Sequence, residues 1–386
     1  MSSADVASLS VDQVIGLMLM VGVRGGDAGA SPMRDDLEVC RAARVGGVIL
    51  FDVDLPAFLR RREAGEEEGA ARMAAVRNVV SPSQTGALSA ALREALRPPG
   101  GLMVAVDQEG GRVVRFNPAR GFAPTVSARE LAAIDDAAWE RSAAANASIV
   151  RGAGCDVNFT PCVDAAVNPA NPIIARKDRS FGADVETVCA CALEVIEAHT
   201  RLGVVTALKH FPGHGSSEGD THLGFVDVTH TWRADPELAV YQRLVGKLDA
   251  SRTMVMTGHL FHAGIDADHP ASLSQAHTTG LLRETLGFRG VVVTDSLDMG
   301  AVTARYGVDE AVLLAVNAGA DILLDAFNGP IAAEEVSRTC PAGRMHEAIA
   351  RALRDGRIDG GEARLRESAR RILGLRRWSA AAMMRG

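Results

Sequence analysis

The side chains best suited to acid–base chemistry gather in one short stretch of the sequence. Positions 209 to 222 hold one lysine, one aspartate and three histidines: Lys209, His210, His214, Asp220 and His222. The apolar run 204–208 before them is β-branched at its start, which is typical of a buried strand. Pro212 and Gly213 then interrupt the backbone. The pattern predicts a strand that ends at Lys209 and His210, followed by a long loop that carries the other side chains.

Such a group of side chains allows more than one chemistry. Imidazole has an ordinary pKa of about 6.5, so it can give and take a proton near neutral pH. Zinc favours the same ligands, and a metal-dependent hydrolase is therefore a competing hypothesis. Its ligands would be His210, His214, Asp220 and His222. No H-E-x-x-H or paired-cysteine pattern supports that hypothesis in the sequence. A polar loop with ordinary surface histidines is the third possibility.

Two other strand-like runs each end in an aspartate. The run 102–106 leads into Asp107, with two glycines soon after it, and the run 291–294 leads into Asp295. A carboxylate at the C-terminal end of a barrel strand suits a site that binds a polar ligand. The alternative for Asp107 is a turn in which it caps the following segment. His259 also follows a strand-like run, and whether it touches a ligand stays open.

A long irregular stretch, residues 160–183, contains three prolines and Arg179. Loops of this length inside a compact domain are usually functional. A guanidinium group is a fixed fork of donors that suits vicinal hydroxyls or a carboxylate. We therefore expect Arg179 to bind a ligand. The alternative is an ion pair with Asp178 or Asp184.

The composition is that of a globular protein. Of 386 residues, 47% are hydrophobic and 23% charged, and the net charge of −7 argues against a nucleic-acid partner. No apolar stretch approaches the roughly 20 residues of a membrane span, and residues 1–23 lack the basic region of a signal peptide. The six cysteines stand mostly in apolar surroundings, which suits reduced thiols in a cytoplasmic protein.

About eight strand-like runs alternate with helical segments, centred near positions 19, 48, 104, 157, 206, 255, 292 and 322. Repeated strand–helix units predict a parallel sheet, and eight of them predict an α/β protein with a single (β/α)8 barrel. A doubly wound open sheet is the alternative, although no G-x-G-x-x-G pattern follows the first run. We expect one domain over residues 1–386, with the charged segment 56–80 as an inserted loop that has no catalytic role.

Several of these segments resemble motifs of glycoside hydrolase family 3, in its β-N-acetylhexosaminidase branch. The resemblance rests on Lys-His-Phe-Pro-Gly-His-Gly at 209–215, Asp-Gln-Glu-Gly-Gly-Arg at 107–112 and Arg-Ser-Phe-Gly at 179–182. Residues 294–299 are similar to the family's Ser-Asp-Asp-Leu-x-Met segment, from which Thr294 and Ser296 depart. The resemblance covers roughly residues 10–375. It implies the barrel, without the second α/β domain of many family β-glucosidases.

The resemblance also implies roles for particular residues. Asp295 matches the catalytic nucleophile, and His222 matches an acid/base histidine paired with Asp220. The residues expected to bind sugar hydroxyls are Asp107, Arg115, Arg179, Lys209 and His210. No cofactor and no metal is implied. The loop that carries His222 must close over the substrate, so we expect it to be mobile.

The implied reaction is the release of terminal N-acetylglucosamine from β-linked glycans or cell-wall (peptidoglycan) fragments through a covalent glycosyl-aspartate. The expected partner is a small carbohydrate, with no membrane contact, and the chain acts as a monomer or homodimer. A β-glucosidase, a β-xylosidase or an N-acetylglucosaminide phosphorylase of the same family is the nearest alternative. A catalytically inactive sugar-binding barrel is a further alternative from another functional class.

Overall fold

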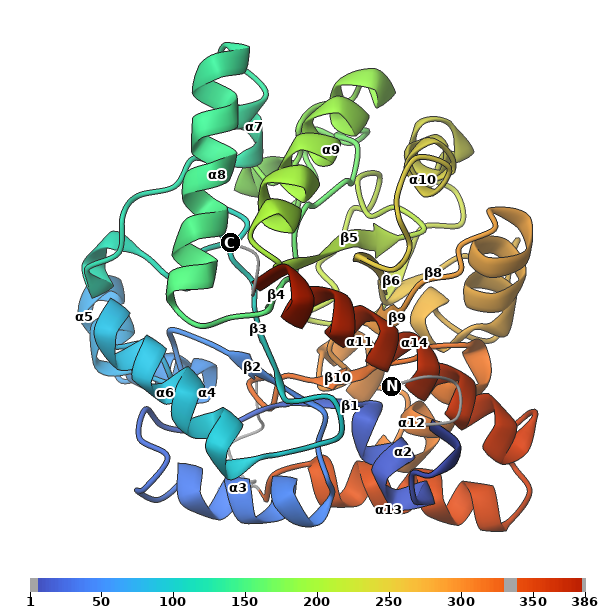
Figure 1. Ribbon diagram of the computed structural model, residues 1–386. Coiled ribbons are helices and arrows are strands. Elements are labelled where there is room, and N and C mark those ends of the chain that lie inside the picture. The colour runs from blue at the N-terminus through green and yellow to red at the C-terminus, as the bar shows by residue number, and fades with distance from the viewer. Residues whose placement is uncertain (1–5, 330–338, 384–386) are drawn as a thin grey trace.

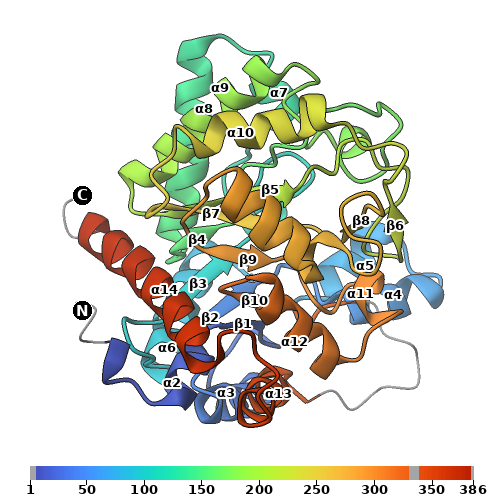
Figure 2. The same ribbon diagram turned by 90° about the vertical axis from the view of Figure 1, so that its right-hand side faces the viewer.

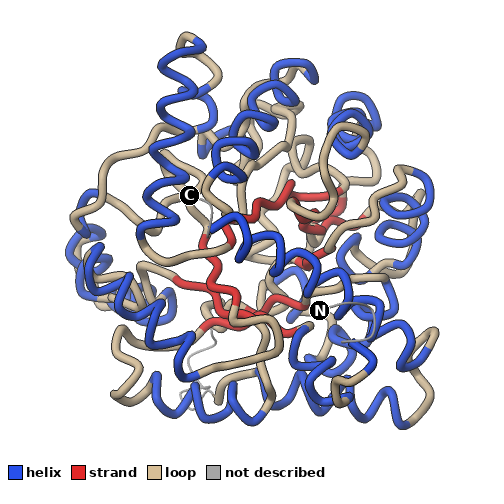
Figure 3. The backbone as a smooth tube through the Cα atoms, in the orientation of Figure 1, coloured by secondary structure: helices blue, strands red, loops and turns tan. Residues whose placement is uncertain are grey.

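The computed structural model describes residues 6–329 and 339–383, so the first residues of the segment examined for a signal peptide, 1–5, lie outside it. Its centre is a sheet of parallel strands ringed by helices (Figures 1 and 3). In spatial order the strands are β10 (Leu323–Asp325), β1 (Leu19–Gly22), β2 (Gly47–Leu50), β3 (Met103–Val106), β4 (Val157–Asn158), β5 (Val205–Phe211), β7 (Thr253–Thr257) and β9 (Val292–Thr294). A parallel bridge between Val293 and Ile322 joins β9 to β10. The predicted (β/α)8 barrel is confirmed, with a strand at each expected position.

Most of the longer helices lie between successive strands on the outside of the barrel, with one just before the first strand and two after the last (Figure 2). They are α2 (Val11–Leu17), α3 (Met33–Ala42), α4 (Leu55–Glu63), α5 (Glu68–Ala74), α6 (Pro82–Ala95), α8 (Asp136–Gly152), α9 (Val185–Arg201), α10 (Ala239–Val245), η5 (Ala276–Thr285), α12 (Val308–Ala318), α13 (Ala342–Arg354) and α14 (Gly361–Met383). Shorter elements are η1 (Pro118–Arg120), α7 (Ala128–Leu131), η2 (Ala175–Lys177), η3 (Ala234–Leu238), η4 (Ala271–Leu273), α11 (Gly300–Thr303) and the two-stranded sheet of β6 (Val226–Asp227) and β8 (Leu260–Phe261). None of the helices in the described ranges is long and apolar enough to cross a membrane.

Every residue of β1, β2, β3, β5 and β7 is buried. A parallel strand is covered on both faces, which is why these segments read as continuous apolar runs rather than alternating ones. The C-terminal helix α14 crosses the N-terminal end of the barrel. There the Arg376 guanidinium donates to the carbonyl of Pro99, at 2.9 Å, and Ser379 Oγ donates to the carbonyl of Gly203, at 2.6 Å. The opposite end, where the strands finish, is left for a binding site.

Residues 56–80 contain more helix than the extended loop with some helix that the sequence suggests, because most of them form α4 and α5. The Asp54 carboxylate accepts from Ala57 N at 2.9 Å and starts α4. Arg61 near the end of α4 pairs with Glu66 at 2.8 Å, just before α5. The run of arginines followed by glutamates therefore lies at a helix end and the next helix start, where each charge sign is favoured by the helix dipole.

The seam between β9 and β10 depends on one buried carboxylate. Asp321 Oδ2 accepts from Val292 N at 3.0 Å and from Arg283 Nη2 at 2.7 Å. Its Oδ1 accepts from Ser368 Oγ at 2.6 Å and from Arg371 Nη1 at 3.1 Å. Asp321 thus joins both seam strands to η5 and α14. It does so at the place where a single bridge, instead of a full ladder of hydrogen bonds, connects β9 to β10.

We expect Asp321→Ala to destabilise the fold by about 3–5 kcal/mol, because it leaves buried arginine charges without their partner. Chemical denaturation followed by circular dichroism measures this change. Asp309→Ala is the matched control. It removes the partner of Arg344 and Arg351 at the surface, and exposed pairs contribute about 0–1 kcal/mol. Equal losses in the two variants would contradict the assigned role of Asp321.

Candidate active site

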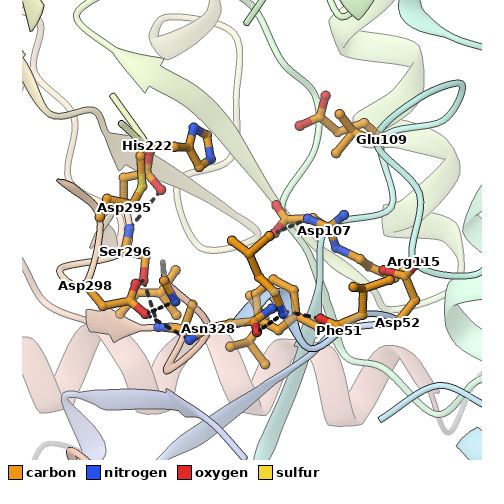
Figure 4. A pocket seen from close by; sticks show the side chains of 18 of the residues that line it. Phe51, Asp52, Asp107, Glu109, Arg115, His222, Asp295, Ser296, Asp298 and Asn328 are labelled. Carbon is orange, nitrogen blue, oxygen red and sulfur yellow. Dashed lines mark hydrogen bonds and ion pairs between the residues drawn. The ribbon is translucent and has the colours of Figure 1, made fainter. Parts of the chain in front are cut away.

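A cavity of about 290 Å³ opens beside the C-terminal ends of the barrel strands. Seven of the eight residues predicted for the site line it: Asp107, Arg115, Arg179, Lys209, His210, His222 and Asp295. The eighth, Asp220, does not line the cavity but is hydrogen-bonded to His222, which does. Figure 4 shows His222 and Asp295 on one side of this pocket and Asp107, Glu109 and Arg115 on the other. The barrel therefore brings together side chains that are up to 188 positions apart in the sequence, from Asp107 to Asp295.

Asp295 follows the last residue of β9, and its position is fixed by the backbone. Its N–H donates to the carbonyl of Thr257 at 2.8 Å, and its Oδ1 accepts from Ser296 N at 2.8 Å. Burial raises the pKa of Asp295, but the nearby His259, His210 and His222 and the Ser296 N–H lower it, with a net shift below the ordinary value. The carboxylate is therefore held ionised, as an attacking group requires.

His222 and Asp220 form a close pair on the loop after β5. Asp220 Oδ1 lies 2.7 Å from His222 Nδ1 and also accepts from His222 N at 2.9 Å. Burial raises the pKa of Asp220, but the two hydrogen bonds to His222 and the nearby charges of His222 and His214 together lower the pKa below its ordinary value. An ionised Asp220 holds the proton on Nδ1. Nε2 of His222 then carries no bond to any described residue and stays available for chemistry.

The opposite wall is a buried network of charges. Glu109 accepts from Arg179 Nε at 2.9 Å and lies 2.6 Å from Lys209 Nζ. Lys209 Nζ also donates to Asp107 Oδ1 at 2.8 Å, and Arg115 Nη2 lies 3.7 Å from Asp107 Oδ2. The predicted alternative for Arg179, a pair with Asp178 or Asp184, is wrong, because its partner is Glu109.

Charge pairing keeps Glu109 and Lys209 of this wall ionised. Burial raises the pKa of Glu109, yet Arg179 and Lys209 lower it far more, and its pKa ends well below the ordinary range. Burial lowers the pKa of Lys209, but Asp107 and Glu109 more than compensate and the pKa is raised. The sequence analysis did not single out Glu109. The signal was its place in the segment 107–112, three residues beyond the end of β3.

His210 is held by Asp164, which the sequence analysis also missed. Asp164 Oδ2 lies 2.6 Å from His210 Nδ1, and Asp164 Oδ1 accepts from His214 N at 2.7 Å. His214 does not line the pocket; it is buried, 2.8 Å from Ser217 Oγ and 3.3 Å from Thr221 Oγ1. Burial and the charge of His210 lower the pKa of His214 to about 4, so it stays neutral. It anchors the catalytic loop.

His259 lies behind the segment that carries Asp295 and is fully buried. Its Nε2 lies 2.8 Å from the Ser296 carbonyl and its Nδ1 lies 2.6 Å from Ser272 Oγ. Asp298, on the same segment, accepts from Ser296 Oγ at 2.6 Å and from Asn328 N at 2.9 Å. Both side chains support the segment that carries Asp295, and His259 has no ring nitrogen left for a ligand.

A metal site is poorly supported in the described part of the chain. The one group of possible ligands close enough together there is Cys162, Asp164 and His210. Its Asp164 already accepts from two backbone N–H groups and the His210 ring. The set proposed for a metal-dependent hydrolase, His210 with residues 214, 220 and 222, is not gathered. His214 faces Thr221, and His222 is bound to Asp220.

The segment 56–80 also contributes to the pocket. Phe58 of α4 and Arg72 of α5 line it, next to Leu55, which starts α4 just before the segment. Arg72 Nη2 lies 2.9 Å from the buried Asp52, at the foot of α4. The charged segment thus forms an outer wall next to β2, although no residue of it was assigned a role from the sequence.

Comparisons with known proteins agree with this geometry. The family model described as the glycosyl hydrolase family 3 N terminal domain matches residues 10–375. The beta-hexosaminidase A of Pseudoalteromonas piscicida is 32% identical over 82% of this chain. The chain spans only 53% of that relative's length. The beta-hexosaminidase of Xylella fastidiosa is 34% identical over 80% of this chain and 82% of its own.

A solved structure agrees over nearly the whole chain. The family 3 β-N-acetylglucosaminidase of Paenibacillus sp. str. FPU-7 superposes with a TM-score of 0.79 and 31% identity, covering 97% of this chain and 63% of that one. The resemblance stated from the motifs is confirmed. The chain belongs to glycoside hydrolase family 3.

Proposed function

We propose that the protein is a retaining β-N-acetylhexosaminidase that removes terminal N-acetylglucosamine from β-linked glycans. The observation that carries the proposal is that one pocket is lined both by Asp295, whose pKa lies below its ordinary value, and by His222, whose Nε2 bonds to no described residue. Retaining glycosidases need a nucleophile and an acid/base group about one linkage. Asp295 takes the first role and His222 the second.

In the first step, an Asp295 oxygen bonds to the anomeric carbon as the glycosidic C–O bond breaks. His222 Nε2 donates its proton to the departing oxygen, so the leaving group departs neutral. In the second step, water attacks the anomeric carbon, His222 Nε2 takes the water proton, and the bond to Asp295 breaks. Asp220 keeps the other ring N–H in place through both steps.

The charged wall orients the sugar in this proposal. Asp107 and Lys209 present one acceptor and one donor near the pocket, and Arg179 and His210 stand beside them. The Arg115 guanidinium lies 5.2 Å from the centre of the Phe51 ring, which keeps it over the pocket floor. These fixed groups suit the vicinal hydroxyls of a sugar, because little reorganisation is needed on binding.

Two finer points belong to the same proposal. The names of the relatives support an acetamido sugar, and cell-wall (peptidoglycan) fragments are the expected source of that sugar. A cytoplasmic location fits the six cysteines, which are buried and unpaired, as in a reducing compartment. A phosphate acceptor is the alternative to water, because a histidine does not repel an anion as a carboxylate would.

We expect Asp295→Ala to abolish turnover of every substrate, and His222→Ala to discriminate between leaving groups. Loss of the general acid should slow a poor leaving group by about 10²–10⁴-fold. A dinitrophenyl glycoside needs no protonation, so its glycosylation step should be much less affected. Steady-state kinetics on dinitrophenyl N-acetylglucosaminide and on chitobiose give the two values. Equal losses on both would remove His222 from the acid role.

The pKa of Asp295 sets an expectation for the acid limb of the pH profile. Because it lies below the ordinary value of 3.8, the carboxylate stays ionised through mildly acid pH. Activity should then be lost only as the pH falls through that lowered value. Measurement of kcat/KM for the dinitrophenyl substrate from pH 3 to 7 tests this. A fall that begins near pH 5 would show that Asp295 is not held ionised as described.

The sugar and the acceptor are tested by product analysis. A panel of aryl glycosides that differ only at the second carbon should show a preference for the N-acetylglucosaminide over the glucoside and the xyloside. Product analysis in phosphate buffer should give free N-acetylglucosamine. Sugar 1-phosphate as the main product would make the protein a phosphorylase, and a preference for glucosides would make it a β-glucosidase.

A further inference from the structure

The loop that carries His222 rests on the segment that carries Asp295. Gly300 N donates to the carbonyl of His222 at 3.2 Å, and Ala301 N donates to the carbonyl of Thr221 at 3.1 Å. Gly300 and Ala301 begin α11, and the first N–H groups of a helix have no partner within the helix. The two loop carbonyls supply the missing acceptors. Both hydrogen bonds join backbone atoms of the loop and of α11.

Gly300 is the residue that permits so close an approach. A Cβ atom placed there would lie 2.8 Å from the His222 carbonyl oxygen and 2.9 Å from the Leu223 carbonyl carbon. Real Cβ atoms essentially never come within 3.0 Å of such atoms. Both neighbours are backbone atoms, which cannot rotate out of the way as the end of a side chain can. Any larger residue at this position must therefore displace the loop or α11.

The α11 side of the contact is the more firmly held. Leu297 N donates to the carbonyl of Leu324 at 2.8 Å, and Asp295 N donates to that of Thr257 at 2.8 Å. The segment is thus tied to both neighbouring strands, β10 and β7. On the loop side, Leu223 is 81% exposed and His222 is itself exposed. A clash at Gly300 should accordingly move the loop and leave Asp295 in place.

We propose that Gly300 is a positioning residue for His222: its missing side chain lets the catalytic loop dock on the nucleophile's own segment. The docked loop sets the acid/base imidazole against the linkage that Asp295 attacks. This inference rests on the proposed function, since it assumes that His222 is the proton donor. Gly300 itself touches neither the sugar nor the proton.

Gly300→Ala tests the inference through the same pair of substrates. Turnover of chitobiose should fall by about 10- to 100-fold, because an acid displaced by about 1 Å loses much of its effect. Turnover of the dinitrophenyl glycoside should change by less than about threefold, and KM should hold for both, because the sugar-binding wall is untouched. The basic limb of the chitobiose pH profile should flatten as His222 ceases to act.

Gly307→Ala is the matched control. Gly307 has a φ of −72°, and a Cβ atom there would meet nothing within 4 Å. The same methyl group is thus added to open space just beyond α11. This variant should match the unchanged protein on both substrates. A leaving-group-dependent loss in Gly307→Ala as well would overturn the assignment to Gly300.

Hydrogen exchange of the unchanged chain gives a second readout that does not depend on the folding of the variant. In the unchanged chain, the Gly300 and Ala301 amides should be protected from exchange. In Gly300→Ala, protection should drop at Ala301 and at residues 220–224 and stay unchanged elsewhere. Unprotected amides in the unchanged protein would overturn the proposal. So would a variant that loses cooperative melting, because Gly300 would then serve the fold.

Failure of the inference is distinguishable from failure of the proposed function. If His222→Ala discriminates between leaving groups and Gly300→Ala does not, the function stands and the positioning role falls. If neither variant discriminates while the amides are protected, the docking exists but His222 is not the acid. Both of these results overturn the role proposed for Gly300.

Discussion

The site depends on the burial of one carboxylate between two cations. Glu109 lies within 3 Å of both Arg179 and Lys209, and all three side chains are at most 7% exposed. A buried charge is tolerated only when it is paired, and loss of one partner leaves the others uncompensated. The three residues come from different elements of the barrel: the loop after β3, the loop after β4, and β5. Their mutual pairing therefore fixes the relative positions of three strand ends and, with them, the groups that face the pocket.

This pairing also decides which groups of the polar wall are left to contact a ligand. Lys209 Nζ contacts both Glu109 and Asp107. Arg179 donates from Nε and Nη2 to Glu109. What remains for a ligand is a small set of oriented groups rather than a diffuse positive surface. Beside Arg115, Phe51 after β2 and Leu55 and Phe58 of α4 add an apolar part to the lining. A pyranose, with hydroxyls at its edge and C–H groups on its faces, matches such a pocket.

Much of this could be predicted from the sequence, because the signals are local. Continuous apolar runs mark buried parallel strands, and an aspartate directly after such a run, as at Asp107 or Asp295, marks the working end of a barrel. The features that escaped prediction depend on distant partners. Glu109 and Asp164 gain their roles from Arg179 and His210, which are 70 and 46 positions away. The charged segment 56–80 was expected to be an inserted loop, since nothing in the local sequence shows that Phe58 and Arg72 line the pocket. His259 also follows a strand, yet it lies behind the segment that carries Asp295 and does not face the pocket.

The two catalytic candidates are held in ways that suit their different tasks. In the proposed mechanism, Asp295 meets the anomeric carbon at bonding distance, and the strands on either side hold its segment. The same mechanism requires products to leave and new linkages to enter, so the loop that carries His222 has to open between turnovers. A backbone hydrogen bond contributes about 0.5–1.5 kcal/mol, so the two bonds at Gly300 and Ala301 favour the docked loop by roughly 5- to 150-fold. That preference is large enough to keep the acid in place during the reaction. It is also small enough for the loop to lift between turnovers.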